Sequence, residues 1–192
     1  GLDRRSVFYV DELSQHVGQR ASRYIAKHEL EYPQPILLRL RPEAYAEFEG
    51  DHQIQLGQRS SVQLDLRWNS ELSLERTCYL LSKALLLQYA LYNFGPGSGP
   101  AMRAWPVAAL ATDAYLSLRP AEALRMQQEL RSEIELSAES IFRLRLADGP
   151  APNASAYWLL QSFEQLPVSR TVSRRFFKQA ISGIDIREPL AI

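Results

Sequence analysis

The clearest pattern in the chain is a strict alternation of apolar and polar side chains over residues 62–68. The apolar members are Val62, Leu64, Leu66 and Trp68, and the polar members are Gln63, Asp65 and Arg67. A period of two predicts a β-strand with one buried face and one face in water. The runs 6–10, 36–40 and 52–56 also have strand length and apolar, β-branched or aromatic residues, so we expect strands there.

Helical spacing dominates most of the remaining sequence. Asp11 stands at the position of a helix cap, and apolar residues recur at helical spacing to about Glu29. Residues 74–94 carry apolar side chains around most of the circumference of a helix, with Ser73 at its N-cap position. This segment is therefore predicted to be the central buried helix.

Glycine and proline divide the rest of the chain into shorter segments. Residues 95–100 and 149–152 are predicted loops, and residues 137–146 fit no single element. Gly183 stands at a C-cap position. The predicted helices cover residues 42–48, 104–118, 120–136, 154–166 and 169–182.

The separation of strands from helices along the chain predicts an α+β fold. We expect a small mixed sheet in the N-terminal third, packed on the central buried helix, and a helical C-terminal part. The chain has 192 residues and shows no internal repeat or linker, so residues 1–192 are predicted to form a single domain.

Composition narrows the choice of partners. Lys and Arg together number 22, as do Asp and Glu, so the formal net charge is zero and a nucleic-acid partner is not expected. No apolar run approaches the roughly 20 residues that span a bilayer. Arg174, Arg175 and Lys178 form a local basic spot, which predicts a solvated helix face. The single cysteine, Cys78, lies in an apolar run and is expected to be buried.

The order of these elements, with Trp105 near the start of the helix after the Gly/Pro loop, resembles the gluzincin-type (peptidase MA-like) metallopeptidases. The resemblance runs from about Ser6 to Leu190. In that family an edge strand, here 62–68, leads into a helix that carries His-Glu-x-x-His. The next helix carries Trp-x-x-Glu-Gly-x-Ala, whose Glu is the third zinc ligand. Weaker similarity continues through Ala156-Tyr157, Phe176-Phe177 and Gly183-Ile184-Asp185. The resemblance implies a zincin-like fold.

The zinc ligands of that family are missing from this chain. In the preferred register Lys83 stands at the first His, Ala84 at the Glu, Leu87 at the second His and Ala108 at the third ligand. Catalytic zinc needs three N, O or S ligands and an open site, and these four side chains do not supply them. The sequence therefore predicts no metal, no cofactor and no peptidase activity.

A protease cleft without metal is still a groove, so the leading hypothesis is a non-catalytic peptidase-like domain that serves binding or structural support. An extended peptide beside the strand 62–68 is one expected occupant, with Trp68 and Trp105 as anchors. Core packing is the alternative for both tryptophans. Docking of exposed helices on a partner protein is a further alternative.

Two more residues of the expected groove are Asp113 and Tyr157. An ion pair between Lys83 and Asp113 is a hypothesis for a brace that replaces the metal, because a buried charge needs a partner. The alternative function is an enzyme of a non-zinc type that uses Lys83, Asp113 and Tyr157. No nucleophile–base pair is visible in the sequence to support it.

The cellular compartment stays open at this stage. The chain begins at Gly1 rather than at a methionine, and the family it resembles is frequently exported. An exported or cell-envelope location is therefore the expectation if a signal segment has been removed.

Overall fold

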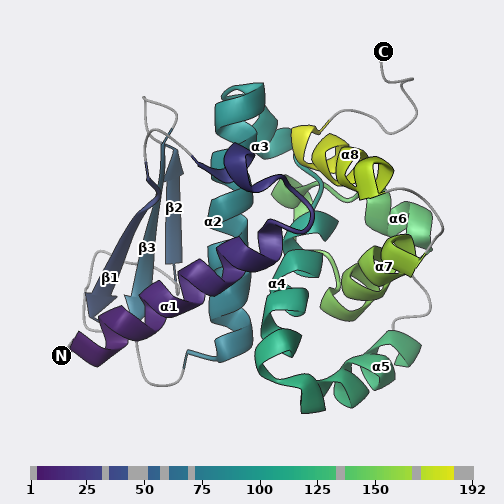
Figure 1. Ribbon diagram of the computed structural model, residues 1–192, viewed down its shortest axis with the longest axis horizontal. Helices are drawn as coiled ribbons and strands as arrows, with labels where there is room; N and C mark the ends of the chain where they lie inside the picture. The colour runs from purple at the N-terminus through teal and green to yellow at the C-terminus, as the bar shows by residue number, and fades with distance from the viewer. Residues whose placement is uncertain are drawn as a thin grey trace.

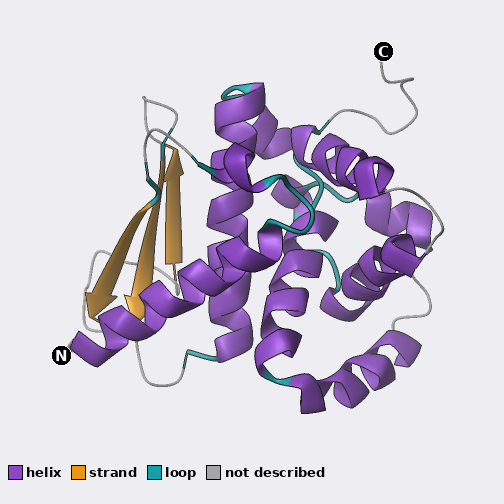
Figure 2. Cartoon of the chain, in the orientation of Figure 1, coloured by secondary structure: helices purple, strands orange, loops and turns teal. Residues whose placement is uncertain are grey.

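The computed structural model describes residues 4–31, 35–42, 52–56, 61–68, 72–132, 137–165 and 170–183. A three-stranded sheet lies on one side of the long helix α2, and the helices α5 to α8 lie on the other side (Figure 1). The described strands all lie before residue 69 and the rest of the described chain is mostly helical, which confirms the α+β class (Figure 2).

The sheet is mixed, as predicted, with the strand order β1-β3-β2. β1 (Leu37–Pro42) runs parallel to β3 (Val62–Trp68), and β2 (His52–Leu56) runs antiparallel to it. The sequence predicts strands at all three positions, and their boundaries differ by one or two residues at most.

β3 is the central strand, so the prediction that it is an edge strand is wrong. Leu64 pairs with Leu38 on one side and with Ile54 on the other. A central strand has both backbone edges engaged in ladder hydrogen bonds and cannot accept an added peptide strand. This pairing removes the peptide groove that the sequence places beside residues 62–68.

The polar face of β3 is less exposed to solvent than its alternation predicts. The inward residues Val62, Leu64 and Leu66 are fully buried, as expected. Asp65, on the other face, is buried too, because Arg41 of β1 forms a salt bridge with it (Nε to Oδ1, 3.4 Å). Gln63 donates a second hydrogen bond to the same carboxylate (2.6 Å).

Helix α1 (Arg4–Ala21) begins where the sequence predicts a strand. Its buried residues are Val10, Leu13, Val17 and Ala21, whereas Val7, Phe8 and Tyr9 are exposed. The helical period thus overrides the β-propensity of residues 6–10, a local preference that tertiary packing often outweighs. Asp11 lies within the helix rather than at its cap. The helix ends at Ala21, well before Glu29, and a 3-10 turn, η1 (Lys27–Leu30), follows.

Helix α2 (Leu74–Phe94) has the predicted bounds. The Ser73 side chain accepts a hydrogen bond from the Arg76 backbone N–H (3.1 Å), which caps the helix, and Gly95 ends it with a φ of +88°. Most residues between Thr77 and Leu91 are buried. α2 is therefore the central helix that the sequence indicates.

The predicted loop 95–100 is only partly a loop, because residues from Ser98 onward form the one-turn helix α3 (Ser98–Ala101). Helix α4 (Trp105–Leu118) follows and packs along α2 and α7. Its alanines at 108, 109, 111 and 114 are buried. Small side chains let the helix backbones approach closely, which explains this arrangement.

The C-terminal elements are η2 (Pro120–Glu122), α5 (Ala123–Ser132), α6 (Ala138–Arg143), η3 (Leu146–Asp148), α7 (Asn153–Gln165) and α8 (Arg170–Ser182). Of these, α7 and α8 match predicted helices closely, whereas α6 and η3 form where the sequence predicted no single element. The predicted helix 120–136 is thus divided into a 3-10 turn and α5. Gly183 ends α8 with a φ of +75°, as its predicted C-cap role requires. Residues 43–48, 133–136 and 184–192, which carried further predictions, lie outside the described residues.

One hydrophobic core joins α1, β3, α2, α4 and α8. A smaller cluster of Leu116, Met126 and Ala154 packs beneath α5. Among the described helices, none combines the length and the apolar character needed to cross a membrane.

Candidate functional site

The positions that align with the zinc motif belong to the core around α2 and α4. Ala84, Leu87 and Ala108 are 1, 7 and 0 % exposed. Ala84 borders a cavity of about 410 Å³ that aliphatic side chains of α1, the sheet and α2 mainly line. Lys83, next to it on α2, is half-buried. These side chains fill space between elements and contribute no ligand for a divalent metal.

Asp113 pairs with Arg20 of α1, a partner that the sequence analysis did not identify. Arg20 donates from Nε to Oδ2 (2.7 Å) and from Nη2 to Oδ1 (2.6 Å). Asp113 is buried, and its hydrogen bond raises the pKa of Arg20 above its ordinary value. Arg20, rather than Lys83, therefore neutralises this carboxylate, and the hypothesis of a Lys83–Asp113 brace is wrong in its choice of cation.

Tyr157 lies near this ion pair. Burial raises the pKa of the Tyr157 phenol, and the negative charge of Asp113 raises it further. Two of the four expected groove residues are thus brought together. They belong to a partly buried polar cluster with Arg20 and Tyr24, and both oxygens of Asp113 are already engaged by Arg20.

The two tryptophans expected in the groove lie at separate places. Trp68 is half-buried at the end of β3, with its ring centroid 6.0 Å from that of Tyr9 on α1. Trp105 is fully buried at the start of α4, among the aromatic rings of α6 and α8. They do not form a common binding surface with Asp113 and Tyr157.

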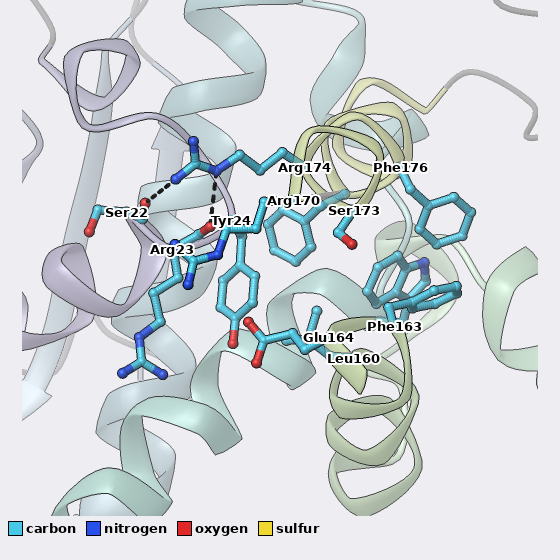
Figure 3. Close-up of a pocket in the computed structure, with 12 residues that line it drawn as sticks. Ser22, Arg23, Tyr24, Leu160, Phe163, Glu164, Arg170, Ser173, Arg174 and Phe176 are labelled. Atoms are coloured by element: carbon cyan, nitrogen blue, oxygen red, sulfur yellow. Dashed lines mark hydrogen bonds between the residues drawn. The ribbon is translucent and has the colours of Figure 1, made fainter. Parts of the chain in front are cut away.

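A pocket of about 600 Å³ opens between the turn after α1 and the helices α7 and α8 (Figure 3). We call it the α1–α7–α8 pocket. Residues that define it include Tyr24, Trp105, Phe163, Glu164, Arg174 and Phe176. Its volume and its mixture of aromatic walls with a few polar groups are typical of small-molecule sites in proteins.

One end of the pocket is aromatic. The ring centroids of Trp105 and Phe176 lie 5.7 Å apart in a stacked arrangement, and those of Phe163 and Phe176 lie 4.7 Å apart. Phe177 packs edge-on against Trp105 at 5.6 Å. The four rings come from α4, α7 and α8, so this wall forms only when the three helices pack together.

The other end of the pocket is cationic. Arg23, Arg170 and Arg174 lie on the side away from Phe163 and Phe176 (Figure 3). The Arg174 Nε donates a hydrogen bond to the carbonyl oxygen of Arg23 (3.1 Å), and its Nη2 donates to that of Ser22 (3.4 Å). Arg174 is half-buried and binds the turn after α1 to α8, so it is not part of a purely solvated helix face.

Two buried donors in the pocket wall have no hydrogen-bond partner among the described residues. They are the Tyr24 hydroxyl and the Trp105 Nε1, on side chains that are 4 and 0 % exposed. Burial raises the pKa of Tyr24, and the charges of Asp113 and Glu164 raise it further, so the hydroxyl keeps its proton. Most buried polar groups in proteins are paired, so two orphans in one pocket call for an explanation.

The sequence contained part of the signal for this site. Arg174 belongs to the basic spot that the sequence shows, and Phe176-Phe177 belong to the weaker part of the family resemblance. Nothing in the local pattern connects them with Arg23 and Tyr24, which lie about 150 residues earlier and reach the pocket only through the docking of α8 on α1.

Comparisons with models of known protein families, with curated protein sequences and with solved structures found no match to this chain. Within the part of the chain that the structure describes, no group of three or more His, Cys, Asp and Glu side chains is placed to hold a metal ion. Burial raises the pKa of the Cys78 thiol to about 12, so it is not a ready nucleophile at neutral pH.

Proposed function

We propose that this chain is a non-catalytic domain with a gluzincin-like order of elements, and that it binds a small molecule in the α1–α7–α8 pocket. The absence of catalysis is inferred from side-chain chemistry. Lys83, Ala84, Leu87 and Ala108 offer no ligand set for zinc and no general base to activate water. The burial of the last three is consistent with a packing role.

The binding half of the proposal rests on one observation. The Tyr24 hydroxyl and the Trp105 Nε1 are buried donors in the wall of one pocket, and neither has an acceptor among the described residues. A buried donor without an acceptor costs about 1–3 kcal/mol. Neither atom is accessible to the empty pocket, so a ligand reaches them only when the wall side chains adjust, and a molecule that then supplies acceptors would remove this cost.

The first experiment blocks the pocket. Ser173 lines it on α8, and Val172, one residue earlier, is 51 % exposed and does not line it. We expect aromatic fragments to give saturation-transfer NMR signals with the wild-type protein and with Val172→Trp, and to lose them with Ser173→Trp. Circular dichroism checks that both variants fold. Fragment signals that persist in a folded Ser173→Trp variant would contradict the proposed site.

The second experiment tests the other part of the proposal, that the chain has no zinc-dependent peptidase activity. The protein is dialysed against zinc, and its metal content, melting temperature and hydrolysis of a peptide library are measured. We expect no stoichiometric zinc, no rise in melting temperature and no cleavage, because a metal that binds the native state would stabilise it. Chelator-sensitive peptide hydrolysis would overturn the non-catalytic part of the proposal. Ligand binding in the pocket would still be decided by the first experiment.

A further inference from the structure

We infer that the ligand of the α1–α7–α8 pocket is a small organic monocarboxylate with an aromatic or acyl body. This inference rests on the proposed function, because it assigns a chemical class to the same site. The carboxylate lies at the arginine end, and the apolar body lies against Trp105, Phe163 and Phe176.

The charge of the pocket wall favours an anion. Arg23, Arg170 and Arg174 line it, and none of them forms a salt bridge within the described part of the chain. A planar guanidinium donates two parallel hydrogen bonds to a carboxylate, which makes arginine well suited to this group. The neutral chain as a whole has no such excess, so the positive charge is a local property of the pocket.

Glu164 limits how much negative charge the pocket accepts. It lines the same wall, and its carboxylate lies on the side to which the Tyr24 hydroxyl points (Figure 3). Its charge contributes to the raised pKa of Tyr24, after burial and the charge of Asp113. Three arginines and one glutamate leave the wall with a net charge of +2, which attracts an anion, and a single carboxylate can accept from the guanidinium donors without placing a second negative charge near Glu164.

The aromatic end defines the rest of the ligand. The rings of Trp105, Phe163 and Phe176 present apolar faces from three helices to one cavity. An indole Nε1 donates and never accepts, so a ligand that reaches the Trp105 Nε1 after the wall adjusts must bring an acceptor such as a carbonyl or hydroxyl oxygen. An aromatic acid with an oxygen on its ring supplies the apolar body, the acceptor and the carboxylate together.

The experiment uses matched probes and isothermal titration calorimetry on the full chain. The probes are 3-(4-hydroxyphenyl)propionate, its uncharged methyl ester, 3-phenylpropionate without the ring oxygen, and octanoate as the acyl acid. We expect the hydroxylated acid to bind about tenfold more tightly than its ester, which is the weakening that loss of a charge-assisted hydrogen bond produces. We also expect it to bind more tightly than 3-phenylpropionate.

Protein variants locate the charge effect. Arg23→Gln combined with Arg170→Gln removes two exposed pocket arginines and leaves the structural contacts of Arg174 intact. We expect this double variant to lose most of the preference for the acid over the ester. Arg5→Gln, an exposed arginine near the opposite end of α1, is the matched control and should keep the preference.

The outcomes separate the ligand class from the site. If Ser173→Trp abolishes binding but the ester binds as tightly as the acid, the site stands and the monocarboxylate class is wrong. If none of the three acids binds the wild-type protein at millimolar concentration, the class is also wrong, and the fragment experiment alone decides whether the pocket binds anything. A preference for the acid that survives in the double variant would contradict the role of the arginines.

Discussion

At the scale of single residues, the Arg20–Asp113 pair is the most deeply placed charge interaction among those described. The side chain of Asp113 is 4 % exposed and that of Arg20 is 17 % exposed, and two hydrogen bonds join them. Removing one partner of a buried pair leaves the other charge without compensation and costs about 3–5 kcal/mol when both are fully buried.

We predict that Asp113→Ala lowers the free energy of unfolding by about 2–3 kcal/mol, less than for a fully buried pair because Arg20 keeps some contact with water. Urea denaturation measures the change. Arg143→Ala, which breaks the exposed pair with Glu139, is the control and should cost no more than about 0.5 kcal/mol. Equal losses of unfolding free energy in the two variants would show that the Arg20–Asp113 pair stabilises the protein no more than an exposed ion pair does.

The orphan hydroxyl of Tyr24 leads to a prediction about pH. Its pKa is raised in the folded protein above the ordinary value of about 10. Between these two values the unfolded chain releases the proton and the folded chain keeps it. The stability that Tyr24 contributes is therefore complete below about pH 10 and is lost as the pH rises further.

We expect Tyr24→Phe to raise the free energy of unfolding by about 1–3 kcal/mol at pH 7, because it removes a buried hydroxyl that has no described partner. Above pH 10 the variant should lose stability less steeply than the wild type, by up to about 1.4 kcal/mol per pH unit. Urea titrations from pH 7 to 11 measure both effects. Parallel alkaline slopes for the two proteins would contradict the raised pKa of Tyr24.

At the scale of elements, the end of α8 depends on a close approach to α3. Gly183 has a φ of +75°, and a Cβ at this position would lie 2.5 Å from the Cβ of Ala101 and 2.6 Å from its carbonyl oxygen. Gly95, at the end of α2, has a similar φ of +88°, but a Cβ there would meet no atom within 4 Å. The two glycines therefore separate backbone strain from steric contact.

We predict that Gly95→Ala costs about 1–3 kcal/mol, because a φ of +88° combined with a ψ of 177° is a conformation that essentially only glycine adopts. Gly183→Ala should cost about 1–3 kcal/mol more, because overpacking adds to the same strain. Thermal and urea unfolding of the two variants measure the difference. A Gly183→Ala variant as stable as Gly95→Ala would mean that the end of α8 moves away from α3 at little cost.

The elements also show where sequence patterns succeed. α2 matches its prediction because Ser73, Gly95 and the intervening apolar surface all favour the same helix. Residues 6–10 carry a conflict between β-propensity and a helical period that begins at Val10, and the longer-range packing of α1 prevails. Strand order is harder still, since alternation along β3 indicates a buried face but contains no information about which strands lie beside it.

At the scale of the whole molecule, the candidate site was largely beyond prediction. The pocket forms where the turn at Ser22 and Arg23 meets Arg174, two segments that are distant in sequence. The expected groove instead relied on a family register, and its four residues divide between the polar cluster, the end of β3 and the aromatic wall. Local periodicity predicts elements well, whereas a pocket depends on how the elements dock.

The continuity of the hydrophobic core leads to the last prediction, that the chain unfolds as one cooperative unit. The main cluster runs from Val10 of α1 through Leu64 and Leu86 to Ile181 of α8, so the sheet and the C-terminal helices share it.

Trp68 reports on the sheet and α1, and Trp105 reports on α4, α6 and α8. Variants that keep a single tryptophan, with the others changed to Phe, allow each half to be followed by fluorescence. Single domains of up to about 150 residues usually unfold in one two-state transition, and the shared core extends that expectation to this chain of 192 residues. In each variant we expect the fluorescence midpoint in urea to coincide with the midpoint from circular dichroism. A Trp68 signal that is lost at a lower urea concentration than the helical signal of the same variant would mean that the sheet and α1 form a separate, weaker unit.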